Sequence, residues 1–102
     1  MKYMVEFEFS ASEGKEIEKK PGGPGPLIGR ISEAFKPSAT FVAVDSRRIY
    51  FVCDLDPAAM GTLMVVGSNA TGQTPKFTPI VAGQDFGGIA GTIMETAAKI
   101  LS

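Results

Sequence analysis

The residues best suited to chemistry are two glutamates near the start of the chain and an arginine and a tyrosine near its middle. Glu6 and Glu8 alternate with apolar residues, so both side chains fall on one face of a β-strand. Arg48 and Tyr50 have the same spacing in a second strand-like run. Pairing of the two strands would bring the four side chains together. A carboxylate beside a cation and a phenol can transfer a proton or hold a polar ligand.

The commoner explanation for such a group is cross-strand charge pairing on a solvated or interfacial sheet face. We favour this structural explanation and keep a ligand-binding site at Glu6, Glu8, Arg48 and Tyr50 as the alternative. The two explanations differ in what a glutamine substitution should do. A structural face should lose stability or dimerisation, whereas a site should lose ligand binding while the fold remains intact.

Other residues that often carry chemistry are better explained as structure. Cys53 is the only cysteine, has no histidine to activate it, and alternates with apolar neighbours, which favours a core position. With no histidine and one cysteine, a zinc site is not expected, and no loop has the carboxylate spacing of a calcium site. We therefore predict no metal ion and no cofactor.

Three glycine-rich segments and one arginine pair could bind anions. Gly22-Gly23-Pro24-Gly25 precedes a helix, but its proline removes an N–H donor that a phosphate cradle needs. The segment 67–72 lacks the Lys-Ser/Thr pair that should follow, and Asp85-Phe86-Gly87 has no other kinase motif around it. Arg47 and Arg48 could hold an anion at a hairpin tip, although adjacent arginines in a turn usually serve solubility.

Composition indicates one globular domain over residues 1–102. The 102 residues are 44% hydrophobic and 21% charged, with a formal net charge of -1. This balance, without a basic stripe, is atypical of a nucleic-acid partner. No apolar run approaches the roughly 20 residues that cross a bilayer, so no membrane association is predicted. The N-terminus has no apolar core with a cleavage site, which leads us to expect a cytoplasmic protein.

The central element is a predicted hairpin over 38–54. Two runs rich in β-branched and aromatic residues, 40–44 and 49–53, flank the polar tip Asp45-Ser46-Arg47-Arg48. Residues 3–9 alternate as a strand with one covered face. A short helical stretch is expected from Ser10 to about Lys20, followed by a Pro/Gly loop over 21–26 that could be a binding lid or surface padding.

The remaining elements follow from periodicity and from proline positions. Helices are predicted over 26–35 and from Pro57 to about Gly67, the second with Asp56 as its cap and a loop over 67–72 behind it. Residues 76–81 should form an edge strand because Pro79 cannot donate to a ladder. A last helix is predicted to follow Asp85, with Ile89, Ile93 and Ile100 at helical spacing.

The order β-α-β-β-α-β with an extra C-terminal helix predicts an α+β, ferredoxin-like fold. Its four-stranded antiparallel sheet would have the first and third strands in the centre and two helices on one face. The other face would carry Met4, Glu6, Glu8, Arg48, Tyr50, Val52, Thr78 and Ile80. An apolar patch of this size is unusual on a monomer, so a homodimer is expected. The C-terminal helix folding over its own sheet is the monomeric alternative.

The plan, with its strand YMVEFEF, its Asp56-Pro57 helix start and its edge strand KFTPIV, resembles the dimeric α/β-barrel superfamily. It is most similar to small stand-alone members of unassigned function. The resemblance implies a homodimer that binds a small polar or aromatic ligand between sheet and helices. The superfamily also includes antibiotic-biosynthesis monooxygenases, haem-degrading enzymes and muconolactone isomerase.

The resemblance also implies alternatives to a simple binding domain. One is a cofactor-free isomerase or monooxygenase-like enzyme with Glu6 or Glu8 as base and Arg48 and Tyr50 as orienting groups. Another is a regulatory ligand-binding module with the PGGPGP segment as its lid. Residues 10–26 depart from the family plan because a full first helix is interrupted there. The resemblance implies histidine and tryptophan residues in a haem-degrading or monooxygenase site. This chain has neither residue.

Overall fold

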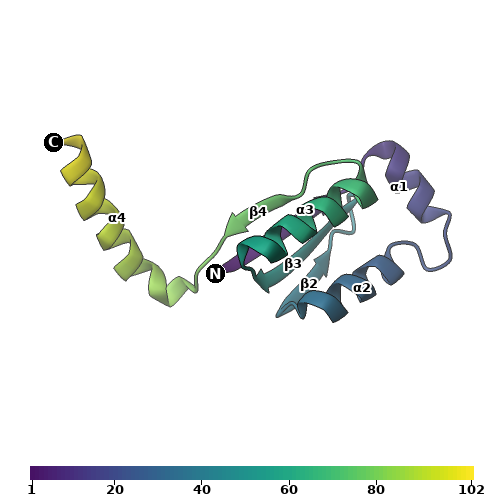
Figure 1. Ribbon diagram of the computed structural model, residues 1–102, viewed down its shortest axis with the longest axis horizontal. Helices are drawn as coiled ribbons and strands as arrows, with labels where there is room; N and C mark the ends of the chain where they lie inside the picture. Colours follow the sequence, from purple (N-terminus) through teal and green to yellow (C-terminus); the bar gives the residue numbers. More distant parts are fainter.

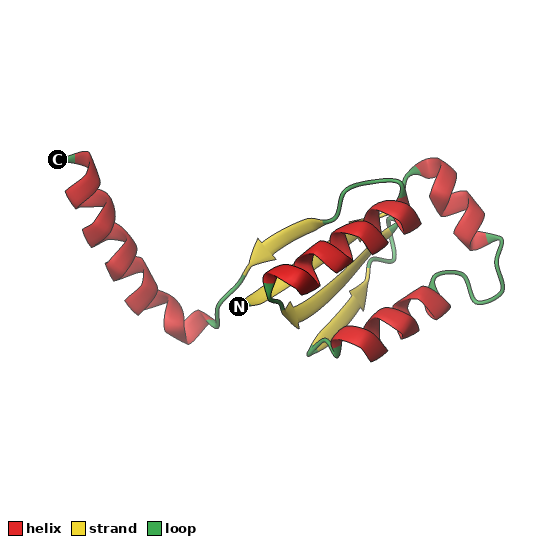
Figure 2. Cartoon of the chain, viewed as in Figure 1, coloured by secondary structure: helices red, strands yellow, loops and turns green.

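The computed structural model describes residues 1–102 and shows a mixed α+β fold with one four-stranded antiparallel sheet and four helices (Figure 2). In chain order the elements are β1 (Lys2–Glu8), α1 (Ala11–Glu18), α2 (Gly25–Phe35), β2 (Ala39–Val42), β3 (Arg48–Asp54), α3 (Pro57–Thr71), β4 (Lys76–Pro79), the 3-10 turn η1 (Gly83–Asp85) and α4 (Phe86–Leu101).

The strands lie in the order β2-β3-β1-β4, so β1 and β3 are the inner strands and β2 and β4 are the edges. β1 pairs with β3 along its whole length, from Lys2 opposite Asp54 to Glu8 opposite Arg48. Pro79 lies on β4, opposite Tyr3 of β1. Proline has no backbone N–H to donate. An edge position suits Pro79 because one side of an edge strand has no neighbouring strand to receive such a hydrogen bond.

The core forms where the alternating apolar residues of β1 and β3 meet the helices. Val5, Phe7 and Phe51 are fully buried, and the rings of Phe7 and Phe51 pack edge to face with centroids 5.5 Å apart. Leu63 of α3 and Ile31 of α2 belong to the same buried cluster and are its contribution from the helices. One sheet face is therefore packed under helices, as the alternation predicted. The opposite face has no helix of this chain on it (Figure 1).

Helix α3 is longer than the sequence indicated. The predicted end at about Gly67, with a loop behind it, is wrong because the helix continues to Thr71 and ends at Gly72, which has a φ of 75°. Gly67 lies inside the helix, where the helix packs against Phe7 of β1 and against Pro75. An added Cβ there would fall 2.3 Å from Pro75 Cγ and 2.9 Å from Phe7 Cε1. This glycine thus allows helix and sheet to pack closely rather than ending the helix.

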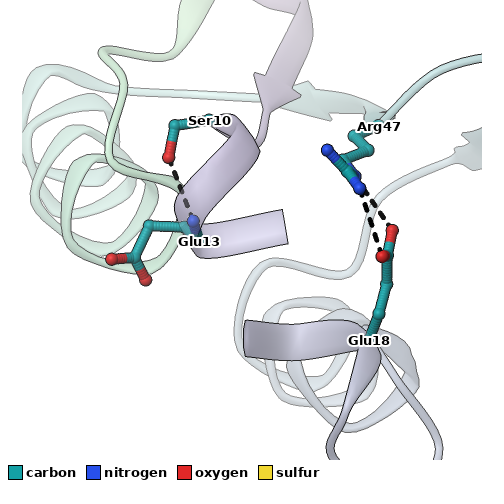
Figure 3. Close-up of polar contacts among 4 residues, drawn as sticks. All are labelled: Ser10, Glu13, Glu18 and Arg47. Carbon is teal, nitrogen blue, oxygen red and sulfur yellow. Dashed lines mark hydrogen bonds and ion pairs between the residues drawn. The ribbon is translucent and has the colours of Figure 1, made fainter. Parts of the chain in front are cut away.

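The other differences concern element ends. β2 stops at Val42 and β4 at Pro79, each two residues before the predicted end. Helix α1 begins after Ser10, whose hydroxyl oxygen accepts a hydrogen bond from the Glu13 N–H at 3.1 Å (Figure 3), as the capping pattern predicted. The chain between α1 and α2 turns at Gly22 and Gly23, with φ values of 80° and 55° that favour glycine.

Helix α4 stands apart from the rest of the molecule (Figure 1). No residue of α4 is buried, and six of its large apolar side chains are exposed, from Ile89 at 37% to Leu101 at 83%. The molecule is 56 Å long and has a Cα radius of gyration of 16.7 Å. A compact domain of this length has a radius of about 13 Å. The C-terminal helix covers neither face of its own sheet.

Two glycine-to-alanine substitutions in α3 test the packing at Gly67. We expect Gly67→Ala to lower the free energy of unfolding by about 1–2 kcal/mol, because overpacking outweighs the gain in helix propensity. The matched control is Gly61→Ala, whose added Cβ meets nothing within 4 Å. It should raise the free energy of unfolding by about 0.5–1 kcal/mol. Urea denaturation of both variants measures the difference. Equal effects would contradict the close approach at Gly67.

Candidate functional site on the open sheet face

The sheet face without helices, called the open face below, is built of rows of side chains that run across the strands. Residues directly opposite each other in antiparallel strands point to the same side. The central row reads Phe41, Tyr50, Glu6 and Lys76; one neighbouring row reads Arg48 and Glu8, and the other reads Ala39, Val52, Met4 and Thr78. The charged rows of Arg48 with Glu8 and of Glu6 with Lys76 form one end of the face, called the polar end below. An uncharged row separates them from Lys2 and Asp54 at the other end.

All four residues predicted as a site lie on this face and are half-buried. Glu8 is opposite Arg48, and the Arg48 Nε donates to Glu8 Oε2 at 3.0 Å. Glu6 is opposite Tyr50. The hydrogen bond and charge of Glu8 raise the pKa of Arg48, with smaller contributions from Tyr50 and Glu6. The pairing of two strands thus brings the four side chains together.

The sequence reasoning missed two members of the central row, Phe41 and Lys76. Lys76 of β4 lies opposite Glu6 on the other side from Tyr50. Its alternation with Phe77 puts it on the same face as Thr78, but only the register shows which residue it meets. Glu6 forms no ion pair, whereas the carboxylate of Glu8 is held by Arg48. Glu6 is therefore the free acceptor in this row, with a phenol and an ammonium group beside it.

The hairpin tip carries a second polar contact that the sequence did not reveal. Arg47 donates from Nε to Glu18 Oε2 at 2.9 Å and from a terminal nitrogen to Glu18 Oε1 at 3.2 Å (Figure 3). Its side chain crosses α1 at Gly14, where an added Cβ would lie 2.4 Å from Arg47 Cδ. The hydrogen bond from Arg47 lowers the pKa of Glu18. Arg47 therefore tethers the hairpin to α1.

A surface cleft of about 530 Å³ beside this contact is lined by Glu8, Glu18, Asp45 and Arg47, together with Phe9, Val44 and Ser46. The sequence had suggested that Arg47 and Arg48 could hold an anion. In the structure each arginine is bound to a glutamate, so an anion would have to displace a carboxylate. Three carboxylates and one guanidinium in the lining also oppose anion binding.

The remaining candidates behave as structural residues. Cys53 is 2% exposed and part of the core, and burial is the main cause of the raised pKa of its thiol. No group of three or more cysteine, aspartate or glutamate side chains is placed to hold a metal ion. Buried side chains fill the layer between the sheet and α3. A ligand is consequently easier to place on the open face than between sheet and helices.

Comparison with known proteins found no match to this chain among protein-family models, curated protein sequences or solved structures. None of the four helices has both the length and the apolar character needed to cross a membrane.

The tether at the hairpin tip can be tested through the Glu18 carboxylate. We expect Arg47→Gln to raise the pKa of Glu18 toward its ordinary value, because the hydrogen bond and charge that stabilise the carboxylate are removed. A ¹³C NMR titration of the side-chain carboxyl measures this shift. Arg48→Gln is the control and should leave the pKa of Glu18 low.

The same pair should affect stability in a pH-dependent way. A carboxyl whose pKa is lowered by folding stabilises the fold above its unfolded pKa and loses this effect as the pH falls through the folded value. The destabilisation by Arg47→Gln should therefore be present at neutral pH and disappear in acid. If Arg47→Gln still lowered the free energy of unfolding at a pH where Glu18 is protonated in the folded protein, the ion pair could not be the cause of the destabilisation.

Proposed function

We propose that this protein is a small-molecule-binding domain that works as a homodimer, with the ligand held against the polar end of the open face. The proposed site consists of Glu6, Glu8, Arg48 and Tyr50, and Lys76 extends it. The ligand is a small polar or aromatic compound. No cofactor is part of this proposal.

The observation that carries the proposal is the distribution of side chains on the open face. Glu6 has no ion-pair partner and lies between Tyr50 and Lys76, while the next row is uncharged. Phe41, at the end of the same row, is 57% exposed. A ligand with an apolar ring and a polar group would pack its ring on Phe41, Tyr50 and Val52. Its polar group would reach Glu6 or Arg48.

The homodimer is supported by the lack of any cover over this face. Half-buried Met4 and Val52 lie on it next to exposed Phe41, and no helix of the chain packs there. A second sheet packed face to face would bury these side chains and enclose the charged end as a cavity. The face is then a dimer interface that still holds polar groups inside it.

The finer fold assignment belongs to the same proposal. We assign the chain to the ferredoxin-like plan and to the dimeric α/β-barrel type of assembly. The inner positions of β1 and β3 support this assignment, as do the edge positions of β2 and β4. One departure is that α1 and α2, two helices joined by the Pro/Gly turn, occupy the place of a single first helix.

A cofactor-free isomerase or monooxygenase-like enzyme is the second candidate, and one observation selects its base. Glu8 is held by Arg48, whereas Glu6 is free to accept a proton from a substrate placed against Tyr50. Tyr50 and Arg48 would orient that substrate. The enzyme and the binding domain thus share one site. They differ in whether a bound compound is converted.

The test uses benzoate, benzamide and benzylamine as probes, read by amide chemical shifts in ¹H–¹⁵N NMR spectra. We expect at least one probe to shift amides of β1 and β3 around Glu6 and Tyr50. Glu6→Gln should weaken this binding about tenfold or more, because a charged hydrogen-bond partner is lost from a partly buried site. The free energy of unfolding and the solution mass should not change.

Glu33→Gln is the matched control, since Glu33 is an exposed glutamate on α2, away from the open face. It should leave probe binding unchanged. Loss of stability or of dimerisation in Glu6→Gln, with no probe binding in the parent chain, would identify the row as a structural charge pair instead. Slow conversion of a bound probe analogue that depends on Glu6 would favour the enzyme.

A further inference from the structure

Helix α4 is amphipathic and has nothing to pack against in its own chain. Its apolar side chains Phe86, Ile89, Ile93, Met94, Ala97, Ile100 and Leu101 fall within one side of the helix, and Thr92, Glu95, Thr96 and Lys99 fall on the other. Most helical stability in proteins comes from packing an apolar face. A helix with this pattern and no buried residue therefore lacks a partner.

The helices that cover the sheet leave an apolar groove between them. An apolar groove of about 320 Å³ lies between α2 and α3 and is lined by Leu27, Ile31, Ala34, Phe35, Thr62 and Val66. Arg30 is the only charged residue of the lining, and it forms no ion pair. Groove and helix are complementary in their apolar character.

The short connection between β4 and α4 disfavours docking of α4 in the groove of its own chain. β4 lies beside β1 at the sheet edge, and α3 packs over β1, so α3 separates β4 from the groove (Figure 1). Between β4 and α4 only residues 80–82 are extended, because 83–85 form η1. Three extended residues span about 10 Å. This is no more than the width of the helix that they would have to cross.

The exposed area of the chain is large enough for a stable dimer. The accessible surface is 6723 Å², whereas a compact monomer of this mass exposes about 5,500 Å². The excess, about 1,200 Å² per chain, corresponds to about 2,400 Å² for two chains, within the range of permanent homodimer interfaces. A second copy of the chain offers both a groove and a helix. If each copy docks its α4 in the groove of the other, the apolar side of α4 and the groove are covered in both copies.

We infer that α4 is an exchanged arm, which docks its apolar side in the α2–α3 groove of a second copy of this chain. The inference shares with the proposed function only the formation of a dimer; it uses a different interface and does not depend on the ligand. Exchange of a terminal element between identical chains creates a dimer with the contacts that one chain cannot make alone.

The first test is the solution mass by sedimentation of the full chain and of paired variants. The parent chain should be a dimer at micromolar concentration. Ile93→Asp on the apolar side of α4 should raise the dimer dissociation constant at least a hundredfold. Thr92→Asp, on the polar side of the same helix, should leave it within about threefold. Because Ile93 has no buried contact within its own chain, circular dichroism of the monomeric variant should show the fold intact.

Cross-linking distinguishes exchange between copies from folding back. Ile93→Cys in one chain and Val66→Cys in a second, differently tagged chain should form a mixed disulfide on oxidation. The native Cys53 is 2% exposed and should not compete. A parent chain that sediments as a monomer, or a disulfide that forms only within one chain carrying both cysteines, would overturn the exchange.

The open face is tested separately by Met4→Asp, which leaves α4 and the groove unchanged. A dimer that is lost in Met4→Asp and retained in Ile93→Asp would overturn the exchanged arm and keep the homodimer of the proposed function. A dimer that is lost in Ile93→Asp and retained in Met4→Asp would support the arm and reject the open face as the interface.

Discussion

The pairing of β1 with β3 is the constraint on which the rest of the structure depends. Seven residues of each strand face one another, and neighbouring residues on each strand point to opposite sides. One side receives Val5, Phe7, Ile49 and Phe51, which form most of the core. The other side receives the charged and polar residues. A shift of one residue would exchange the two sides, so the core itself determines which residues reach the open face.

The candidate site follows from the same pairing. Glu8 meets Arg48 and Glu6 meets Tyr50 because they are opposite residues in that register, and β4 adds Lys76 on the far side of Glu6. The hairpin tip is held in place by Arg47, which binds Glu18 across the surface of α1. One arginine of the adjacent pair thus belongs to the open face and the other fastens a helix. Arg48 is the first residue of β3, whereas Arg47 lies in the bend that precedes this strand.

The helical layer is less complete than the sheet. Helices α2 and α3 leave an apolar groove between them, and α4 projects beyond the end of the sheet with its apolar side uncovered (Figure 1). The open face of the sheet has no cover either. Three surfaces that normally pack inside a domain are therefore exposed in one copy. The homodimer proposed above would cover them with a second copy of the chain.

Much of this arrangement could be predicted from local pattern. Alternation in β1 and β3 placed Phe7 and Cys53 in the core and Glu6 with Arg48 on the opposite face, and Pro79 indicated an edge strand. Helix ends were less predictable. Gly67 resembled a helix end in the sequence, yet it lies within α3 and has no room for a Cβ beside Phe7 and Pro75.

The periodicity of the sequence determined which residues share a face, because the directions of neighbouring side chains follow from backbone geometry alone. Only the tertiary structure decided which faces meet. The contact of Lys76 with the central row, the ion pair of Arg47 with Glu18 and the position of α4 away from its own sheet all join segments distant in the chain. Such contacts depend on register and packing between elements, which no local pattern specifies.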